Sequence, residues 1–185
     1  MTDAPDDSDY SDDSAQPATD PAQAAADLER LLRATVERLD ASGARDEALG
    51  EVRLPRGFGP FKTSVQIAPV GRAWRLGILL VTSDARLFRV GRITRATETG
   101  RPQSLSLSVE QRRAERVAAT KGHFAEGEVV NFEYEAIALD PESLARGDGS
   151  LSIDGSRVVL AWNSPGDRRD LAAYLDEMFV LLFDS

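Results

Sequence analysis

The sequence contains no cysteine and only one histidine, His123, in 185 residues. Without a thiol the chain cannot form disulfides, use a thiolate nucleophile, or hold zinc or an iron–sulfur cluster through cysteine. Lysine is almost as rare, with Lys62 and Lys121 beside 20 arginines. This scarcity of thiol, imidazole and amine groups counts against the standard catalytic classes.

Long apolar segments are also missing. The longest aliphatic or aromatic run, Met178–Phe183, is much shorter than the roughly 20 residues that a membrane-spanning helix needs. The first ten residues have neither the basic nor the apolar region of a secretory signal. We therefore expect a cytoplasmic protein without a transmembrane segment. Its length suits a single domain, over residues 21–185.

The net charge of −9 is unevenly distributed along the chain. Residues 1–20 hold seven aspartates and no base, whereas residues 72–121 hold eleven bases and four acids. Residues 122–185 are acidic again, with thirteen acids and four bases. The composition of residues 1–20 predicts a disordered acidic tail. Either this tail or the acidic C-terminal third screens the basic middle by folding over it, or the tail only improves solubility.

Two helices are predicted in the first two thirds of the chain. Asp20-Pro21 has the residues of a helix start, and leucines at helical spacing follow it as far as Ser42-Gly43. A second, inserted helix is predicted from Ser108 to about Thr120, opening on a Ser-x-x-Gln capping box. It is composed mainly of arginine, glutamate and alanine, so its core-facing side is thin.

A C-terminal amphipathic helix is the clearest element. It is predicted to start from an Asp167 cap, and its apolar stripe continues to Leu182. Its final turn is apolar on all sides because of Val180, Leu181 and Phe183. We expect this turn to be buried; the alternative is an interface.

The remaining predicted elements are strands and turns. A turn is expected at Ser83–Arg86, and Asp154-Gly155 favours a tight hairpin because both residues tolerate positive φ. Loops are expected at residues 57–60 and 97–107. The predicted strands are Thr63–Val70, Trp74–Thr82, Leu87–Thr94, Val129–Leu139, Leu151–Ile153 and Arg157–Asn163.

The element order predicts an α+β fold. Consecutive strands joined by short turns favour an antiparallel sheet of about six or seven strands, with N-terminal and C-terminal amphipathic helices and one inserted helix. A strand meander closed by a C-terminal helix resembles a pleckstrin-homology (PH) or GRAM module. Leu79-Leu80-Val81-Thr82 followed by Arg86-Leu87-Phe88 resembles the GRAM pattern. With a helix at each end, the element order equally resembles the type III secretion chaperone fold.

No catalytic, metal or cofactor motif is found. The sequence has no Gly-x-Ser-x-Gly motif, so no serine is presented to His123 as a nucleophile. One histidine with two loop glutamates, Glu126 and Glu128, is a weak set of metal ligands. Neither lysine follows a serine by three residues, so no hydroxyl is predicted beside a lysine. Residues 57–63 lack the glycine before lysine of a phosphate loop, and we interpret them as a turn. Glu133 and Glu135 are expected on one exposed strand face.

The basic middle is the one candidate binding site. An arginine fork binds carboxylate or phosphate through two hydrogen bonds, which suits an anionic ligand or an acidic protein partner. Residues three apart on a strand alternate between its faces, so these arginines are not all expected on one surface. The candidate anion- or partner-binding residues are Arg89, Arg92, Arg95, Arg112, Arg113 and Arg116.

Residues 50–183 resemble a small family of actinobacterial proteins often labelled "glutaminase". The resemblance rests on residues 70–80, 86–88, 91–96, 108–113 and 124–132. It implies an amidohydrolase, but it supplies no catalytic residues. Familiar glutaminase chemistry uses a cysteine, a serine activated by a lysine three residues on, or threonines in large asparaginase-like folds. The first two are absent and the chain is too short for the third, so we interpret the label as inherited.

The sequence therefore predicts a non-catalytic cytoplasmic interaction or accessory domain that binds a protein partner. The alternatives are an amidohydrolase, as the resemblance implies, and a PH-like module that binds anions or lipids with peripheral membrane contact. Nucleic acid is not an expected partner, because the pI is near 4.7.

Overall fold

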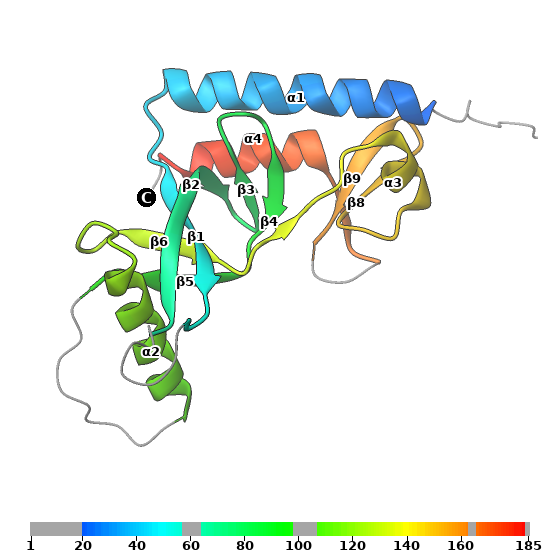
Figure 1. The fold of residues 1–185 in the computed structure, drawn as a ribbon. Helices are drawn as coiled ribbons and strands as arrows, with labels where there is room; N and C mark the ends of the chain where they lie inside the picture. Colours follow the sequence, from blue (N-terminus) through cyan, green and yellow to red (C-terminus); the bar gives the residue numbers. More distant parts are fainter. Residues whose placement is uncertain (1–19, 57–63, 98–106, 163–165, 184–185) are drawn as a thin grey trace, which may run out of the picture.

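The computed structural model describes residues 20–56, 64–97, 107–162 and 166–183, and it has the predicted α+β class (Figure 1). The predicted acidic tail and the loops at residues 57–60 and 97–107 lie mostly or wholly outside these ranges. In chain order the elements are α1 (Pro21–Ala41), β1 (Glu47–Arg53), β2 (Gln66–Leu76), β3 (Leu79–Val81), β4 (Leu87–Arg89), β5 (Arg92–Arg95), α2 (Leu107–Lys121), β6 (Val129–Phe132), β7 (Glu135–Ala136), α3 (Pro141–Arg146), β8 (Leu151–Asp154), β9 (Arg157–Ala161), β10 (Arg168–Asp170) and α4 (Leu171–Leu181).

The described strands form two sheets. The larger has seven strands in the order β5-β6-β1-β2-β3-β4-β7, and the smaller has the order β10-β9-β8. The pairs are antiparallel, as predicted, except that β1 and β6 run parallel. A parallel neighbour is possible here because a long connection, including α2, separates β1 from β6.

The large sheet curls back on itself. Only Val90 and Gly91 separate β4 from β5, and only Glu133 and Tyr134 separate β6 from β7. Yet β4 and β7 end one side of the sheet, whereas β5 and β6 end the other. Two continuous chain segments therefore join the two ends of the sheet. The strand predicted over Leu87–Thr94 is therefore two strands, β4 and β5, with a bend between them.

Both bends have identifiable causes. A Cβ on Gly91 would lie 1.9 Å from the carbonyl oxygen of Glu133, so only glycine allows the two bends to touch. Glu133 has a positive φ of 52°, which ends β6. The predicted strand Val129–Leu139 is therefore wrong as one element. Glu133 and Glu135 accordingly do not share one face of a single strand.

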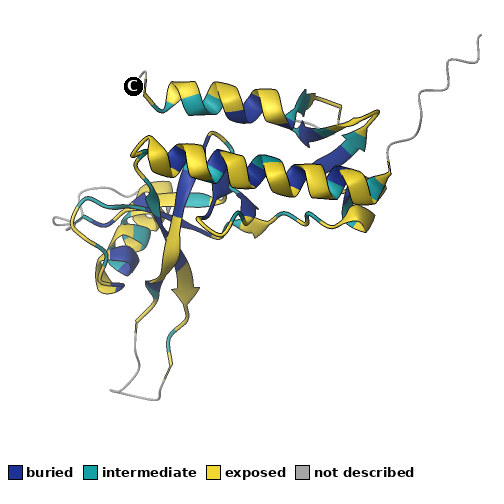
Figure 2. Ribbon diagram, turned by 90° about the horizontal axis from the view of Figure 1, so that it is seen from above, coloured by how far each residue is buried: buried dark blue, intermediate teal, exposed yellow. Residues whose placement is uncertain are grey.

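The main core lies between the helices and the middle of the large sheet. Leu28, Leu32 and Leu39 of α1 pack there with Leu79 and Val81 of β3. Figure 2 shows the buried residues of α1 along one side and the exposed residues along the other. Alternation along β3 sends Leu80 to the opposite face, inside the curl.

Tyr174 of α4 fixes the turn between β2 and β3. It is fully buried; its hydroxyl donates to the carbonyl oxygen of Leu76 at 3.0 Å and accepts from the amide of Ile78 at 2.9 Å. Burial raises the pKa of Tyr174, so the hydroxyl keeps the proton that it donates. The turn at Gly77 (φ +60°) lies inside the predicted strand Trp74–Thr82, and β2 continues through the predicted break after Val70.

The helix starts were predicted with mixed success. Asp20 caps α1 through the amide of Ala22, as predicted. α2 begins one residue before the predicted Ser108, a difference within the usual variation of helix ends. α4 is capped by Asp170 rather than Asp167, because residues 168–170 form β10. The short helix α3 was missed, although its Asp140-Pro141 start repeats the signal of α1.

The expected burial of the final turn of α4 is wrong. Val180, Leu181 and Phe183 are 53%, 49% and 51% exposed. They follow the part of α4 that packs on the core through Leu171, Tyr174 and Leu175. The alternative, an interface at this turn, stays a prediction.

Substitution of Gly91 by alanine tests the contact between the bends. We expect Gly91→Ala to lower the free energy of unfolding by about 1–3 kcal/mol, since the new methyl group overlaps the Glu133 carbonyl. Gly149→Ala is the matched control, because a Cβ there meets no atom within 4 Å. Urea denaturation measures both. Equal stability of the two variants would show that the bends do not depend on this contact.

Candidate functional site

Strand β5 and helix α2 form the walls of a cleft of about 500 Å³. Three predicted arginines line it: Arg95 at the end of β5, and Arg112 and Arg116 on α2. The last two are four residues apart, so they lie on one helix face, one turn from each other. We call this space the arginine cleft. Its other lining residues are Ile93, Thr94, Thr97 and Glu115.

Small side chains place α2 against the large sheet. Ala118 and Ala119 are buried and pack with Ile67, Val130 and Phe132. The thin apolar side predicted for this helix is thus its core contact. Arg112 and Arg116 are not part of this buried contact, and all three arginines of the cleft are exposed.

Carboxylates of the fold neutralise the arginines beside the cleft. Arg92 pairs with Glu115, and its other nitrogen lies 3.7 Å from Glu133. Arg72 pairs with Asp46 at 2.8 Å and with Glu128 at 2.5 Å. Hydrogen bonds to these two carboxylates, Asp46 first, raise the pKa of Arg72. The acidic C-terminal third thus screens part of the basic middle, through Glu128 and Glu133.

The arginines of the cleft have no such partner within the described residues. Arg95 donates to the carbonyl oxygen of Gly127 at 3.4 Å, and Arg112 donates to that of Ser108 at 3.2 Å. Neither of these bonds neutralises charge. Arg116 has no side-chain hydrogen bond or ion pair there. Among the described residues that line the cleft, the one carboxylate is that of Glu115, and it is already paired with Arg92.

The other predicted arginines lie elsewhere. Arg92 lines a neighbouring apolar groove of about 230 Å³ with Val52, Val65 and Phe132. Arg113 is half-buried and lies 4.0 Å from Glu110. The structure therefore brings together three of the six candidates.

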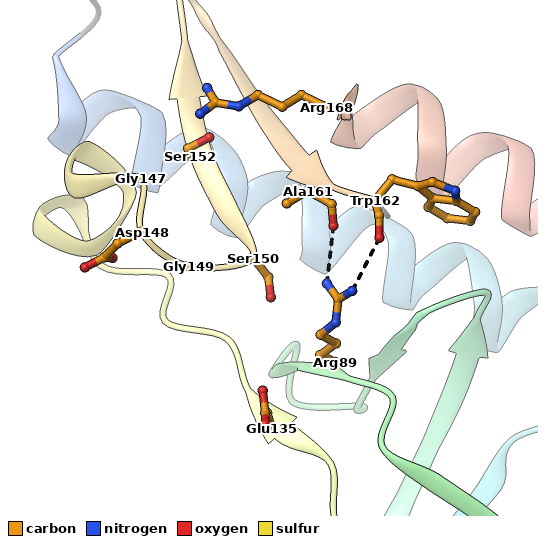
Figure 3. Close-up of a pocket in the computed structure, with 10 residues that line it drawn as sticks. All are labelled: Arg89, Glu135, Gly147, Asp148, Gly149, Ser150, Ser152, Ala161, Trp162 and Arg168. Atoms are coloured by element: carbon orange, nitrogen blue, oxygen red, sulfur yellow. Dashed lines mark hydrogen bonds between the residues drawn. The ribbon is translucent and has the colours of Figure 1, made fainter. Parts of the chain in front are cut away.

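Arg89 belongs to a second cleft of about 510 Å³ between the two sheets (Figure 3). Its guanidinium donates to the carbonyl oxygens of Ala161 at 3.2 Å and Trp162 at 3.3 Å, at the end of β9. It therefore ties β4 of the large sheet to the small sheet. Side chains of both charges line the cleft, with Glu135 and Asp148 as the acids and Arg89 and Arg168 as the bases. This second cleft was missed from the sequence because it depends on α3, which was not predicted, and on the approach of β4 and β7 to the small sheet.

One pair of side chains corrects the sequence analysis. Lys121 donates to the hydroxyl oxygen of Ser64 at 2.9 Å, although no hydroxyl was predicted beside a lysine. The two residues are 57 positions apart, so no local motif could reveal them. Both side chains are exposed, and neither lines a cleft described above. The pair is therefore a surface hydrogen bond outside these clefts.

Within the described part of the chain, the single histidine and the serine hydroxyls of the second cleft lie apart from each other. His123 is exposed on a turn after α2, with a φ of 65°. The hydroxyls of Ser150 and Ser152 in the second cleft hydrogen-bond to no carboxylate or imidazole there. Across the described ranges, no group of three or more acidic or histidine side chains is placed to hold a metal ion.

Comparison of the chain with protein-family models, with curated proteins and with solved structures finds no match. Among the described helices, none is long and apolar enough to cross a membrane.

Removal of the Arg89 side chain tests the tie between the sheets. We expect Arg89→Met to destabilise the protein by about 1.5–3 kcal/mol, because two carbonyl oxygens lose a charged donor. Amide exchange in β9 should quicken in the same variant. Arg86→Met, which removes an exposed pair with Asp84 and a guanidinium 5.7 Å from the ring centroid of Phe88, should cost about 1 kcal/mol or less. Unchanged exchange in β9 in Arg89→Met would contradict the tie.

Proposed function

We propose that this protein is a non-catalytic interaction domain that binds an acidic segment of a protein partner in the arginine cleft. One observation carries the proposal: Arg95, Arg112 and Arg116 converge on one cleft, and none has a carboxylate partner among the described residues. The fold supplies carboxylates to Arg72 and Arg92 close by. Three arginines without a carboxylate partner in the described part of the chain share this one cleft, so their charge is together available to a ligand.

The spacing of the arginines suits an extended acidic segment. Arg112 and Arg116 are separated by about one helical turn, roughly 6 Å. Alternate side chains of an extended strand are about 6.6 Å apart and lie on the same side. Two carboxylates at positions i and i+2 can therefore meet these two arginines, while Arg95 approaches from the β5 wall.

The resemblance to proteins labelled "glutaminase" adds little to this proposal. In the described residues, no hydroxyl in either cleft hydrogen-bonds to a base that could activate it. The PH-like alternative shares the anion chemistry, so the test must separate an acidic peptide from a membrane surface. An anionic membrane is an extended surface, so it repels the acidic parts of a protein whose net charge is −9. A short acidic peptide in the cleft meets fewer of those acidic parts, and we therefore favour the peptide.

Charge reversal in the cleft tests the proposal. A fluorescein-labelled octaglutamate peptide is titrated with the full chain, and binding is followed by anisotropy. We expect the double variant Arg112→Glu/Arg116→Glu to lose at least about tenfold in affinity, since two charged contacts become repulsive. Affinity of the unaltered protein should fall as salt is raised.

The matched control is Arg30→Glu/Arg157→Glu, which makes the same change in net charge on α1 and β9, away from α2 (Figure 1). It should bind the peptide within about twofold of the unaltered protein. Equal losses in the two variants would show that only net charge matters and would refute the cleft. Binding to vesicles rich in phosphatidylserine, without binding to the peptide, would favour the lipid-binding alternative.

A further inference from the structure

The strongest concentration of acid in the chain remains outside the described fold. Residues 1–19 contain six aspartates and no basic residue. Glu128 and Glu133, from the acidic C-terminal third, are already engaged with Arg72 and Arg92. The arginine cleft and the N-terminal segment are thus complementary in charge.

We infer that residues 1–19 of the same chain occupy the arginine cleft and compete with the acidic partner for it. This inference rests on the proposed function, because it names the regulator of the same site. The N-terminal segment resembles the expected ligand: it presents carboxylates on a segment with few apolar residues. A partner must displace it, so the affinity measured for the partner is reduced by the fraction of molecules with a free cleft.

The length of the segment limits which aspartates reach the cleft. α1 spans about 31 Å and β1 about 23 Å by their rise per residue. Figure 1 shows the start of α1 beside the small sheet, with α2 near the far end of β1. In this view α2 lies below the end of α1 and away from its start, so at least about one length of α1, roughly 31 Å, separates the start of this helix from the cleft.

An extended chain covers about 3.3–3.6 Å per residue. Asp3 and Asp6 are 17 and 14 residues before Asp20, so they reach about 46–61 Å from it. Asp12 and Asp13 are eight and seven residues before Asp20 and reach only about 23–29 Å. Only the first part of the segment can therefore lie in the cleft.

This difference in reach defines the experiment. The full chain is compared with Asp3→Asn/Asp6→Asn and with the matched control Asp12→Asn/Asp13→Asn, using the octaglutamate peptide. The two variants change the net charge equally. We expect the first to bind the peptide about threefold to fivefold more tightly than the unaltered protein, because two competing ion pairs are lost. The second should differ by less than about 1.5-fold.

Each outcome is decisive. Equal gains in both variants would indicate a general effect of net charge and would overturn occupancy by the N-terminal segment. No gain in either variant, with the unaltered protein binding the peptide, would overturn it and leave the proposed function standing. Failure of all three proteins to bind the peptide would overturn the proposed function itself. A gain that disappears on dilution of the protein would assign the segment to a second copy and overturn the same-chain occupant.

Side-chain NMR measures the chemical shifts of individual arginines, which report a local contact rather than the net charge of the protein. The Nε–Hε signals of Arg112 and Arg116 should shift between the unaltered protein and Asp3→Asn/Asp6→Asn in the absence of peptide. The signal of Arg157 on β9 should stay in place. Identical arginine spectra in the two proteins would refute the contact.

Discussion

The contact of Gly91 with the backbone of Glu133 determines how the charged residues are distributed. It allows two chain segments to bend together, so that β4 and β5, two residues apart in sequence, lie at opposite ends of the large sheet. Arg89 at the end of β4 then meets the small sheet, whereas Arg95 at the end of β5 lies beside α2. A straight strand would keep these arginines together on two faces of one element.

Ion pairing then divides the basic region into structural and available charge. Arg72 and Arg92 are held by carboxylates from distant parts of the chain, and Arg89 is held by carbonyl oxygens. The arginine of each ion pair is partly exposed, and ion pairs in contact with water contribute little to stability, about 0–1 kcal/mol each. Their larger effect is to occupy Arg72 and Arg92, whereas Arg95, Arg112 and Arg116 lie together between β5 and α2 without a carboxylate partner among the described residues.

The sequence predicted elements whose signals are local. The Asp20-Pro21 start of α1 and the Asp154-Gly155 hairpin were correct because a cap or a turn depends on neighbouring residues. The bend at Gly91 was missed, since the need for glycine comes from a carbonyl group 42 positions along the chain. The pair of Ser64 with Lys121 was missed for the same reason. The candidate arginines were identified by type, but the choice of three among six needed the packing of α2.

The alanine contact beneath α2 has a consequence for how the cleft can change. Because Ala118 and Ala119 set how near the helix lies to the sheet, the gap between Arg95 and the helix arginines is governed by uncharged, buried residues. A methylene group added beneath the helix would displace its whole outer surface, and with it two guanidinium groups at once. The anion binding that we propose for the cleft can therefore be tuned by steric volume in the interior, while Arg95, Arg112 and Arg116 stay the same.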